Sequence, residues 1–372
     1  MSGPRNPLER IEDFIDLLDR STLERRDNLN LRYIKPDDII NDSLEDYEYY
    51  PDEEVQVPEI VIEENEVIDF NSFNNGDICD IAAIDSGIVR LGETKNGLFF
   101  ALRGSIIIDS NHNRQAYLFR TGPRYLSFSK KLELLYRIGQ DLLRPNLFVE
   151  LDNSDQNNPV PIQVKKGVAD DSHQYADRFR NWFERLLQLI ALERIHNGVV
   201  LFDGALTLRT RDTPSTFLNY LSTNANVNNN AIIAISKQSN LQVRDVPIHF
   251  WLDEESHTSG YKRLTSLLTI GRQQRILGNL YAVRFTPAGP TFRMDVKAVD
   301  GQRDKEAIDN FYISCLMKAG FPDILVRAHA HSYFTSGDVT CYQSWIRANY
   351  NIIPKLEVNL GPPFAPFGGR FK

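Results

Sequence analysis

The 372-residue chain is 42% hydrophobic and 25% charged, which is typical of a soluble globular protein with a sizeable core. Its net charge of −8 is uneven, because residues 1–70 contain 7 basic and 21 acidic residues whereas residues 71–372 contain 35 and 29. No apolar run reaches the ~18–20 residues of a membrane span, which excludes an integral membrane protein. The three cysteines are far apart in the sequence, which argues against a zinc ribbon or a disulfide framework and favours a location in the reducing cytoplasm.

The leader, residues 1–70, has two parts. Apolar residues from Leu8 to Leu18 recur at helical spacing, which predicts an amphipathic helix over 7–27. Such a helix packs on its own core or on a partner helix in a dimer. The acidic stretch 37–69 is either an ordered edge or an extended linker, and no secretory signal is expected at the start.

The body, residues 71–372, alternates apolar strands with helices. We predict strands at 80–91, 97–108, 116–120, 199–203 and 231–236, helices at 130–143 and 172–196, a loop at 152–166 and an Asn-rich turn at 224–230. A hairpin over 280–285 and 291–296, a helix over 304–318 and an irregular tail rich in Pro, Gly and Phe over 361–372 complete the chain. This order predicts an α/β protein with a mixed sheet and helices on its faces.

Several catalytic motifs are missing from the sequence. It contains no GxxxxGK[ST] phosphate-binding loop, no GxGxxG, no HExxH, no EF-hand loop and no GxSxG elbow. The chain is therefore not expected to hydrolyse ATP itself.

Three carboxylates stand in apolar surroundings, namely Asp85 in IAAIDSGIV, Glu184 in WFERLLQLI and Asp203 at the end of VVLFD. A carboxylate buried without a partner costs several kcal/mol, so each needs a basic group, backbone amides or a cation. Each also has a purely structural interpretation: Asp85 lies in a β-bulge, Glu184 pairs with an arginine on its helix, and Asp203 belongs to a turn.

Spacing links two of these carboxylates. If the strand at 199–203 runs back beside the helix at 172–196, Asp203 and Glu184 both lie about 20 Å from the turn between them. Glu193 lies only about 6 Å from the turn and on the opposite helical face. Asp85 on a neighbouring strand would complete an all-oxygen cluster that suits Mg²⁺ or Mn²⁺.

Two histidines, His329 and His331, lie in FPDILVRAHAHSYF. Their side chains share a face if the segment is extended and diverge if it is helical. If neither histidine has a function, one is expected to be exposed and the other buried. Alternatively, an imidazole adds a nitrogen ligand that favours Mn²⁺ over Mg²⁺, or orients the attacking water.

These motifs resemble those of the NurA nuclease family, whose core is ribonuclease H-like. The similarity covers roughly residues 71–350 and lies in AAIDSGIVRL (Asp85), the helical Glu184, VVLFDGAL (Asp203), AIIAISKQSNL (Lys237), FPDILVRAH (His329) and the hairpin YAVRFTPAGPTFRMDV. In one departure, Ser86-Gly87 stands where the family more often has Gly-Ser.

The resemblance implies a Mn²⁺-dependent nuclease that cuts single-stranded DNA, resects duplex ends from 5′ to 3′ in double-strand-break repair, forms a homodimer and docks onto a hexameric HerA-type translocase. By this resemblance Asp85, Glu184, Asp203 and His329 hold the metal in a two-metal mechanism, with Mg²⁺ as the alternative ion, and Lys237 neutralises developing charge. Side chains that could contact the DNA backbone, or equally be solvated surface charges, are Arg103, Arg120, Arg124, Lys130, Lys131 and Arg327.

Two other interpretations stay open from the sequence. One is a different ribonuclease H-like nuclease, such as a RuvC-type junction resolvase. The other is a catalytically inactive scaffold that binds DNA or a translocase, which the Ser86-Gly87 order permits.

Overall fold

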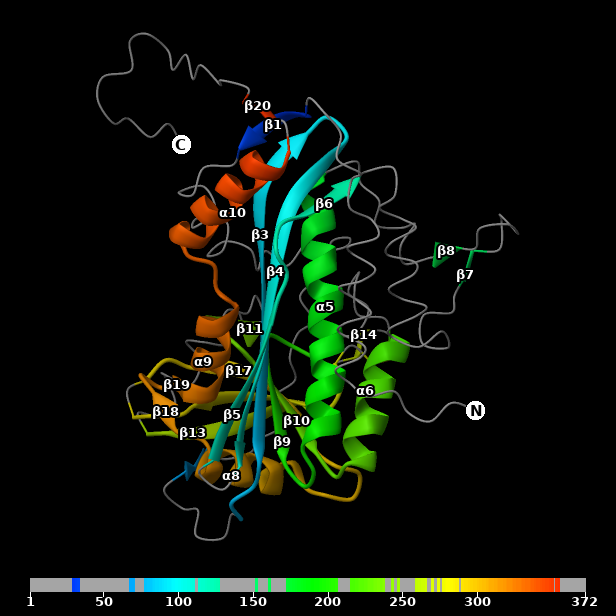
Figure 1. Cartoon of the computed structure of the whole chain (residues 1–372). Helices are drawn as coiled ribbons and strands as arrows, with labels where there is room; N and C mark the ends of the chain where they lie inside the picture. The colour runs from blue at the N-terminus through cyan, green and yellow to red at the C-terminus, as the bar shows by residue number, and fades with distance from the viewer. Residues whose placement is uncertain are drawn as a thin grey trace.

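A computed structural model gives the fold of the chain (Figure 1). The structure describes residues 29–33, 67–70, 77–110, 113–127, 151–152, 160–161, 172–206, 215–237, 242–243, 246–247, 258–265, 269–270, 273–274, 276–287, 289–350 and 352–354. The predicted leader helix at 7–27, the predicted helix at 130–143 and the tail lie outside these residues. No helix in the described ranges is long and apolar enough to cross a membrane.

Five strands form the centre of a larger mixed sheet. These strands, in chain order, are β3 (Ile81–Thr94), β4 (Gly97–Ser110), β5 (Asn113–Arg120), β9 (Val199–Asp203) and β10 (Ala231–Ser236). They lie in the order β5-β4-β3-β9-β10, with the β3–β4–β5 meander antiparallel and β9 and β10 parallel to β3. This order and these directions define the ribonuclease H-like fold, so the predicted mixed α/β sheet is confirmed.

Further strands extend this sheet at both ends. The sheet continues from β10 through β17 (Phe292–Lys297), β16 (Asn279–Arg284), β13 (Gly260–Thr265) and β2 (Ile68–Asp69). On the other side, β6 (Arg124–Ser127) pairs with β4, β1 (Leu29–Tyr33) pairs with β3, and β20 (Ile352–Pro354) pairs with β1. Two-stranded pairs are β7 (Leu151–Asp152) with β8 (Val160–Pro161), β11 (Gln242–Val243) with β12 (Val246–Pro247), β14 (Thr269–Ile270) with β15 (Gln273–Gln274), and β18 (Met317–Lys318) with β19 (Phe321–Pro322).

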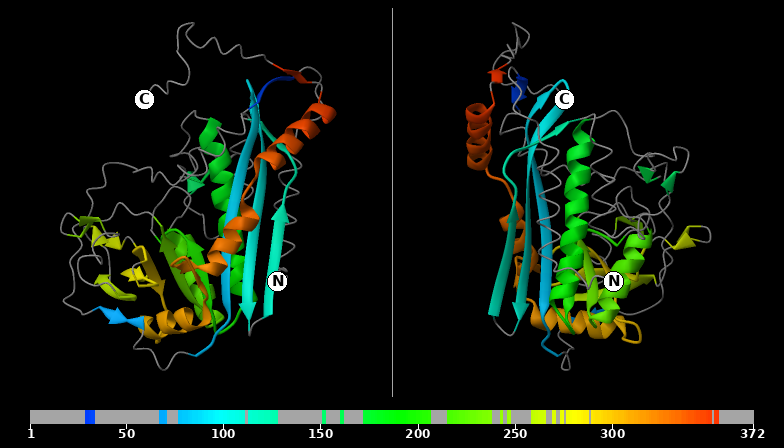
Figure 2. Two further views of the ribbon diagram at one scale, coloured as in Figure 1. Left: turned by 90° about the vertical axis from the view of Figure 1, so that its left-hand side faces the viewer. Right: turned by 45° about the vertical axis from the view of Figure 1, so that its right-hand side comes forward.

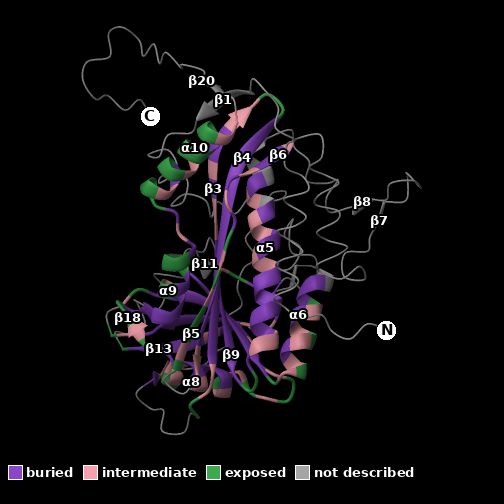
Figure 3. Cartoon of the chain, viewed as in Figure 1, coloured by how far each residue is buried: buried purple, intermediate pink, exposed green. Residues whose placement is uncertain are grey.

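Helices cover both faces of the central sheet (Figure 2). Helices α5 (Ser172–Arg194) and α6 (Ser215–Val227) pack on one face, over Ala82, Ile84 and Val200. Helices α8 (Asp304–Ser314) and α9 (Asp323–Ser332) pack on the other, over Ile81 and Ala83, and α10 (Ser336–Asn349) follows them along the upper part of β3 and β4. Alternate residues of each strand face opposite sides, so a strand covered on both faces, such as β10, is apolar over most of its length. Figure 3 shows that most of the central sheet is buried.

Most predicted elements of the body agree with the structure, and some of their ends differ. The long predicted helix ends at Arg194, and the helix predicted to reach residue 318 ends at Ser314. The Asn-rich turn predicted at 224–230 is wrong in its first half, because α6 runs to Val227. The predicted loop at 152–166 contains part of the β7–β8 pair.

Candidate active site

The candidate site lies where β9 ends beside the middle of β3. The last residue pair between these strands is Ile84 with Phe202, so Asp85 and Asp203 each stand one residue beyond it. Strand β3 continues to Thr94, whereas β9 stops at Asp203. Parallel neighbours lie about 4.8 Å apart, and the carboxyl ends of such strands are where α/β sheets bind ligands.

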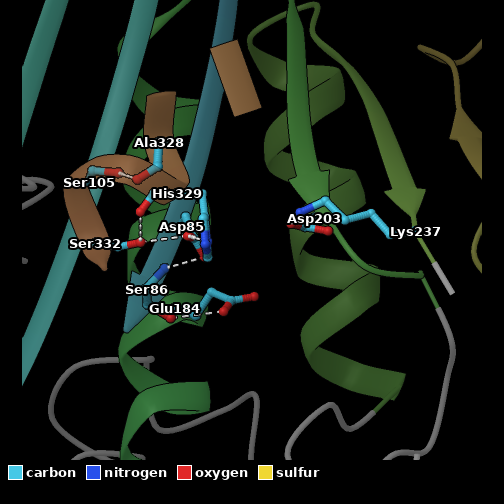
Figure 4. A network of polar contacts seen from close by, with 9 residues as sticks. All are labelled: Asp85, Ser86, Ser105, Glu184, Asp203, Lys237, Ala328, His329 and Ser332. Atoms are coloured by element: carbon cyan, nitrogen blue, oxygen red, sulfur yellow. Dashed lines mark hydrogen bonds and ion pairs between the residues drawn. The ribbon is translucent and has the colours of Figure 1, made fainter. Parts of the chain in front are cut away.

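The Asp85 carboxylate is fixed by three donors (Figure 4). His329 donates its Nδ1–H to Oδ2 at 3.0 Å, and the Ser332 hydroxyl donates to the same oxygen at 2.5 Å. The backbone amide of Ser86 donates to Oδ1 at 2.8 Å. The carboxylate is 5% exposed, so these contacts replace much of its lost hydration. Both side-chain donors come from the last turn of α9.

Glu184 reaches the site from α5, on the opposite face of the sheet. The Ser86 hydroxyl donates to its Oε2 at 2.9 Å, and Figure 4 shows its carboxylate pointing toward the side where Asp203 and Lys237 lie. Desolvation and the nearby Asp85 charge raise the pKa of Glu184, although Arg185 and Arg180 oppose this. The protein therefore places a second carboxylate here at an electrostatic cost.

Asp203, the last residue of β9, pairs with Lys237, which follows β10. The Lys237 Nζ donates to Oδ2 of Asp203 at 2.7 Å and lies 5.0 Å from the centre of the Phe321 ring. Burial raises the pKa of Asp203, the Lys237 charge lowers it, and Asp85 adds a further raising effect. Asp85 thus lies within electrostatic reach of both other carboxylates.

The two histidines diverge because their segment is helical. His329 faces Asp85, whose hydrogen bond raises the pKa of the imidazole, while burial opposes the charge. The side chain is still 55% exposed, so its Nε2 edge is open to solvent or substrate. His331, two residues further along α9, is exposed.

Replacing Glu184 with glutamine is expected to stabilise the metal-free protein. Because the pKa of Glu184 is raised, the folded state favours its protonated form, and this favourable contribution is lost as pH rises through the folded pKa. We therefore expect Glu184→Gln to melt at a higher temperature than wild type at pH 8 in EDTA, with a smaller difference at pH 5. Thermal unfolding at both pH values tests this. Glu193→Gln, on the same helix, is the control, and a Glu184→Gln protein that melts lower at both pH values contradicts the prediction.

The four side chains Asp85, Glu184, Asp203 and His329 form an open set rather than a closed cation site. In the described ranges, no three His, Cys, Asp or Glu side chains are close enough together to hold a metal as they stand. The donor chemistry nevertheless fits a hard divalent cation, since carboxylate oxygens and one imidazole suit Mg²⁺ or Mn²⁺. Burial raises the pKa values of Glu184 and Asp203, and the Asp85 charge adds to this effect; a bound cation would lower both pKa values.

The six predicted DNA contacts have different environments. Arg103 is buried and forms a bidentate ion pair with Asp338, so its charge is neutralised within the protein. Arg327 is exposed and pairs with Asp323 at 2.6 Å. Arg120 is exposed and Arg124 is half-buried. Lys130 and Lys131 lie outside the described residues.

Sequence reasoning missed Ser332 and the helix that carries it. Residues three apart lie on the same face of a helix, so His329 and Ser332 would have been grouped had 323–332 been recognised as helical. Pro322 directly before the helix and Asp323 in its first turn are the sequence signals for that start.

The fold agrees with that of a solved nuclease. No protein-family model and no curated protein matches the chain. The NurA nuclease from Sulfolobus solfataricus matches over 76% of this chain and 86% of its own, at 15% sequence identity and a TM-score of 0.50, so the two share a fold. A structure of NurA with manganese matches over 92% of this chain and 98% of its own, at 10% identity and a TM-score of 0.41.

Proposed function

We propose that this chain is a divalent-metal-dependent DNA nuclease of the NurA type. The observation that carries the proposal is that Asp85, Glu184, Asp203 and His329 lie around the point where β9 ends beside the middle of β3. The shared fold and the motif resemblance support it. Acidic clusters at this position suit phosphodiester hydrolysis, whose developing negative charge needs a cationic clamp.

The motif resemblance and the contacts of these side chains support a role for each residue. Asp85, Glu184, Asp203 and His329 would hold the metal, Mn²⁺ or Mg²⁺, in a two-metal site. When bound, the metal activates water and stabilises the negative charge on the phosphate. Lys237, whose side chain is 47% exposed beside Asp203, neutralises charge on the substrate. The open Nε2 edge of His329 is available to a ligand, because Asp85 holds the ring through Nδ1.

The finer biology rests on the resemblance. In this proposal residues 71–372 form the nuclease unit and 1–70 an extension, and a homodimer cuts single strands and resects duplex ends from 5′ to 3′ during double-strand-break repair. A HerA-type translocase supplies the ATP hydrolysis for which the chain has no phosphate-binding loop. Backbone contacts come from Arg120, Arg124, Lys130, Lys131 and Arg327, whereas Arg103 is omitted because Asp338 engages it.

Cleavage of linear DNA tests the proposed function. Wild-type protein should degrade 5′- and 3′-end-labelled DNA with Mn²⁺ or Mg²⁺ and not with EDTA, and the two labels give the polarity. Asp85→Ala should abolish degradation, because it removes the carboxylate to which both α9 donors bind. Wild-type protein that leaves every DNA intact, alone and with a HerA-type partner, would favour the scaffold interpretation.

A further inference from the structure

We propose that Ser332 is a positioning residue that fixes the Asp85 carboxylate for metal binding. This inference rests on the proposed function, since it assigns a role to a side chain next to the proposed metal ligands. Ser332 is 1% exposed, and its hydroxyl donates to Oδ2 of Asp85 across 247 positions of sequence. A contact of 2.5 Å between a hydroxyl and a carboxylate oxygen is typical of a charge-assisted hydrogen bond.

The hydrogen bonds that the two oxygens of Asp85 accept show the effect of the Ser332 contact. Each carboxylate oxygen can accept about two hydrogen bonds. Oδ2 accepts from His329 and Ser332 and is therefore filled by protein donors. Oδ1 accepts only the Ser86 amide among the described residues, so it keeps acceptor capacity. Ser332 thus selects which oxygen of Asp85 remains available to a cation.

The backbone around Ser332 allows the end of α9 to lie close to β3. A Cβ on Gly87 would lie 2.3 Å from the Ser332 carbonyl oxygen, so only glycine lets the end of α9 come this close to β3. Arg103, which pairs with Gly87 across β3 and β4, donates to the carbonyl of Tyr333 at 2.9 Å. The same guanidinium holds Asp338 at the start of α10. The segment that follows Ser332 is therefore anchored independently of the Asp85 contact.

Ser105 on β4 offers a matched comparison, because its hydroxyl contacts the same helix, α9. It is fully buried on β4, and its hydroxyl donates to the carbonyl of Ala328 on α9 at 2.8 Å. Ser105 therefore helps to dock α9 without touching Asp85. If Ser332 acted only by docking α9, removing either hydroxyl would have similar consequences.

The experiment compares Ser332→Ala, Ser332→Cys and Ser105→Ala in the full-length chain. Mn²⁺ affinity is measured without DNA by isothermal titration calorimetry, and cleavage is measured against Mn²⁺ concentration. Loss of a residue that orients a ligand costs about 10- to 100-fold in metal affinity. We expect that loss for Ser332→Ala, an intermediate loss for Ser332→Cys because a thiol is a weak donor, and near wild-type affinity for Ser105→Ala. Cleavage by Ser332→Ala should recover at high Mn²⁺.

Thermal melting separates this result from a folding defect. The proposal requires Ser332→Ala to lose Mn²⁺ affinity while melting no lower than Ser105→Ala. Equal Mn²⁺ affinities for Ser332→Ala and Ser105→Ala, with wild type binding Mn²⁺ and cutting DNA, would overturn the role of Ser332 and leave the proposed function intact. A wild-type protein that neither binds Mn²⁺ nor cuts DNA would overturn both.

Discussion

Replacing Asp203 with asparagine is expected to lower the rate of DNA cleavage at least about 100-fold, the scale of losing one transition-state charge stabiliser. Asp203 contributes a half-buried carboxylate at the end of β9, one residue beyond the last β3–β9 pair, and asparagine keeps its shape without its charge. Initial rates on end-labelled linear DNA at saturating Mn²⁺ give the effect on chemistry. Filter binding in EDTA should show unchanged DNA affinity.

The chain contains a second lysine–aspartate ion pair that serves as a control for Asp203→Asn. Lys297 and Asp300 form an ion pair at 2.7 Å, the distance of the Lys237–Asp203 pair. Asp300 is largely exposed, and it follows β17 near the start of β10, at the end of the strands opposite to Lys237. Asp300→Asn should therefore cleave DNA at the wild-type rate. Normal cleavage by Asp203→Asn would remove Asp203 from the site, and equal losses in both variants would point to a general effect of breaking a lysine pair.

Replacing Asp295 with alanine is expected to lower the free energy of unfolding by about 3–5 kcal/mol, the cost of removing one partner of a buried ion pair. Asp295 lies on β17 and is fully buried. Its two oxygens accept from Nε and Nη2 of Arg293, both at 2.8 Å, and Oδ2 also accepts the backbone amide of Leu206 at 2.8 Å. The variant leaves a buried guanidinium without this carboxylate and frees the segment that follows Asp203.

Urea denaturation of wild type, Asp295→Ala and Asp300→Ala measures this effect. Asp300→Ala is the matched control, because it breaks an ion pair at the exposed end of the same sheet region and should change stability little. We also expect Asp295→Ala to cleave DNA more slowly, since Leu206 lies three residues after Asp203. A loss of stability below about 1 kcal/mol, the scale of a surface pair, would show that other groups satisfy Arg293.

The sequence by itself determined the central elements of the fold. The strands at 199–203 and 231–236 were predicted because short unbroken runs of apolar residues are typical of strands buried on both faces. The long helix α5 was predicted because its apolar residues recur at helical spacing. Helix α6 was missed because its Ser, Thr and Asn residues are typical of turns, and tertiary packing of Phe217, Leu218 and Leu221 overrides that preference.

The sequence also indicated the acidic residues of the candidate site. Asp85, Glu184 and Asp203 are conspicuous because a carboxylate inside an apolar run needs a partner, and the distances along helix and strand placed two of them at one level. The same argument could not find their protein partners, since it identifies the need for a donor and not the donor itself.

Only the tertiary structure decided which groups those partners are. Arg103 looked like a surface cation in the sequence, and the docking of α10 makes it the buried partner of Asp338. Ser332 looked like an ordinary hydroxyl, and the close approach of α9 to Gly87 brings it to Asp85. These contacts join residues 235 and 247 positions apart. Local periodicity carries no information about such pairs, because they form only when separate helices pack on the same strand.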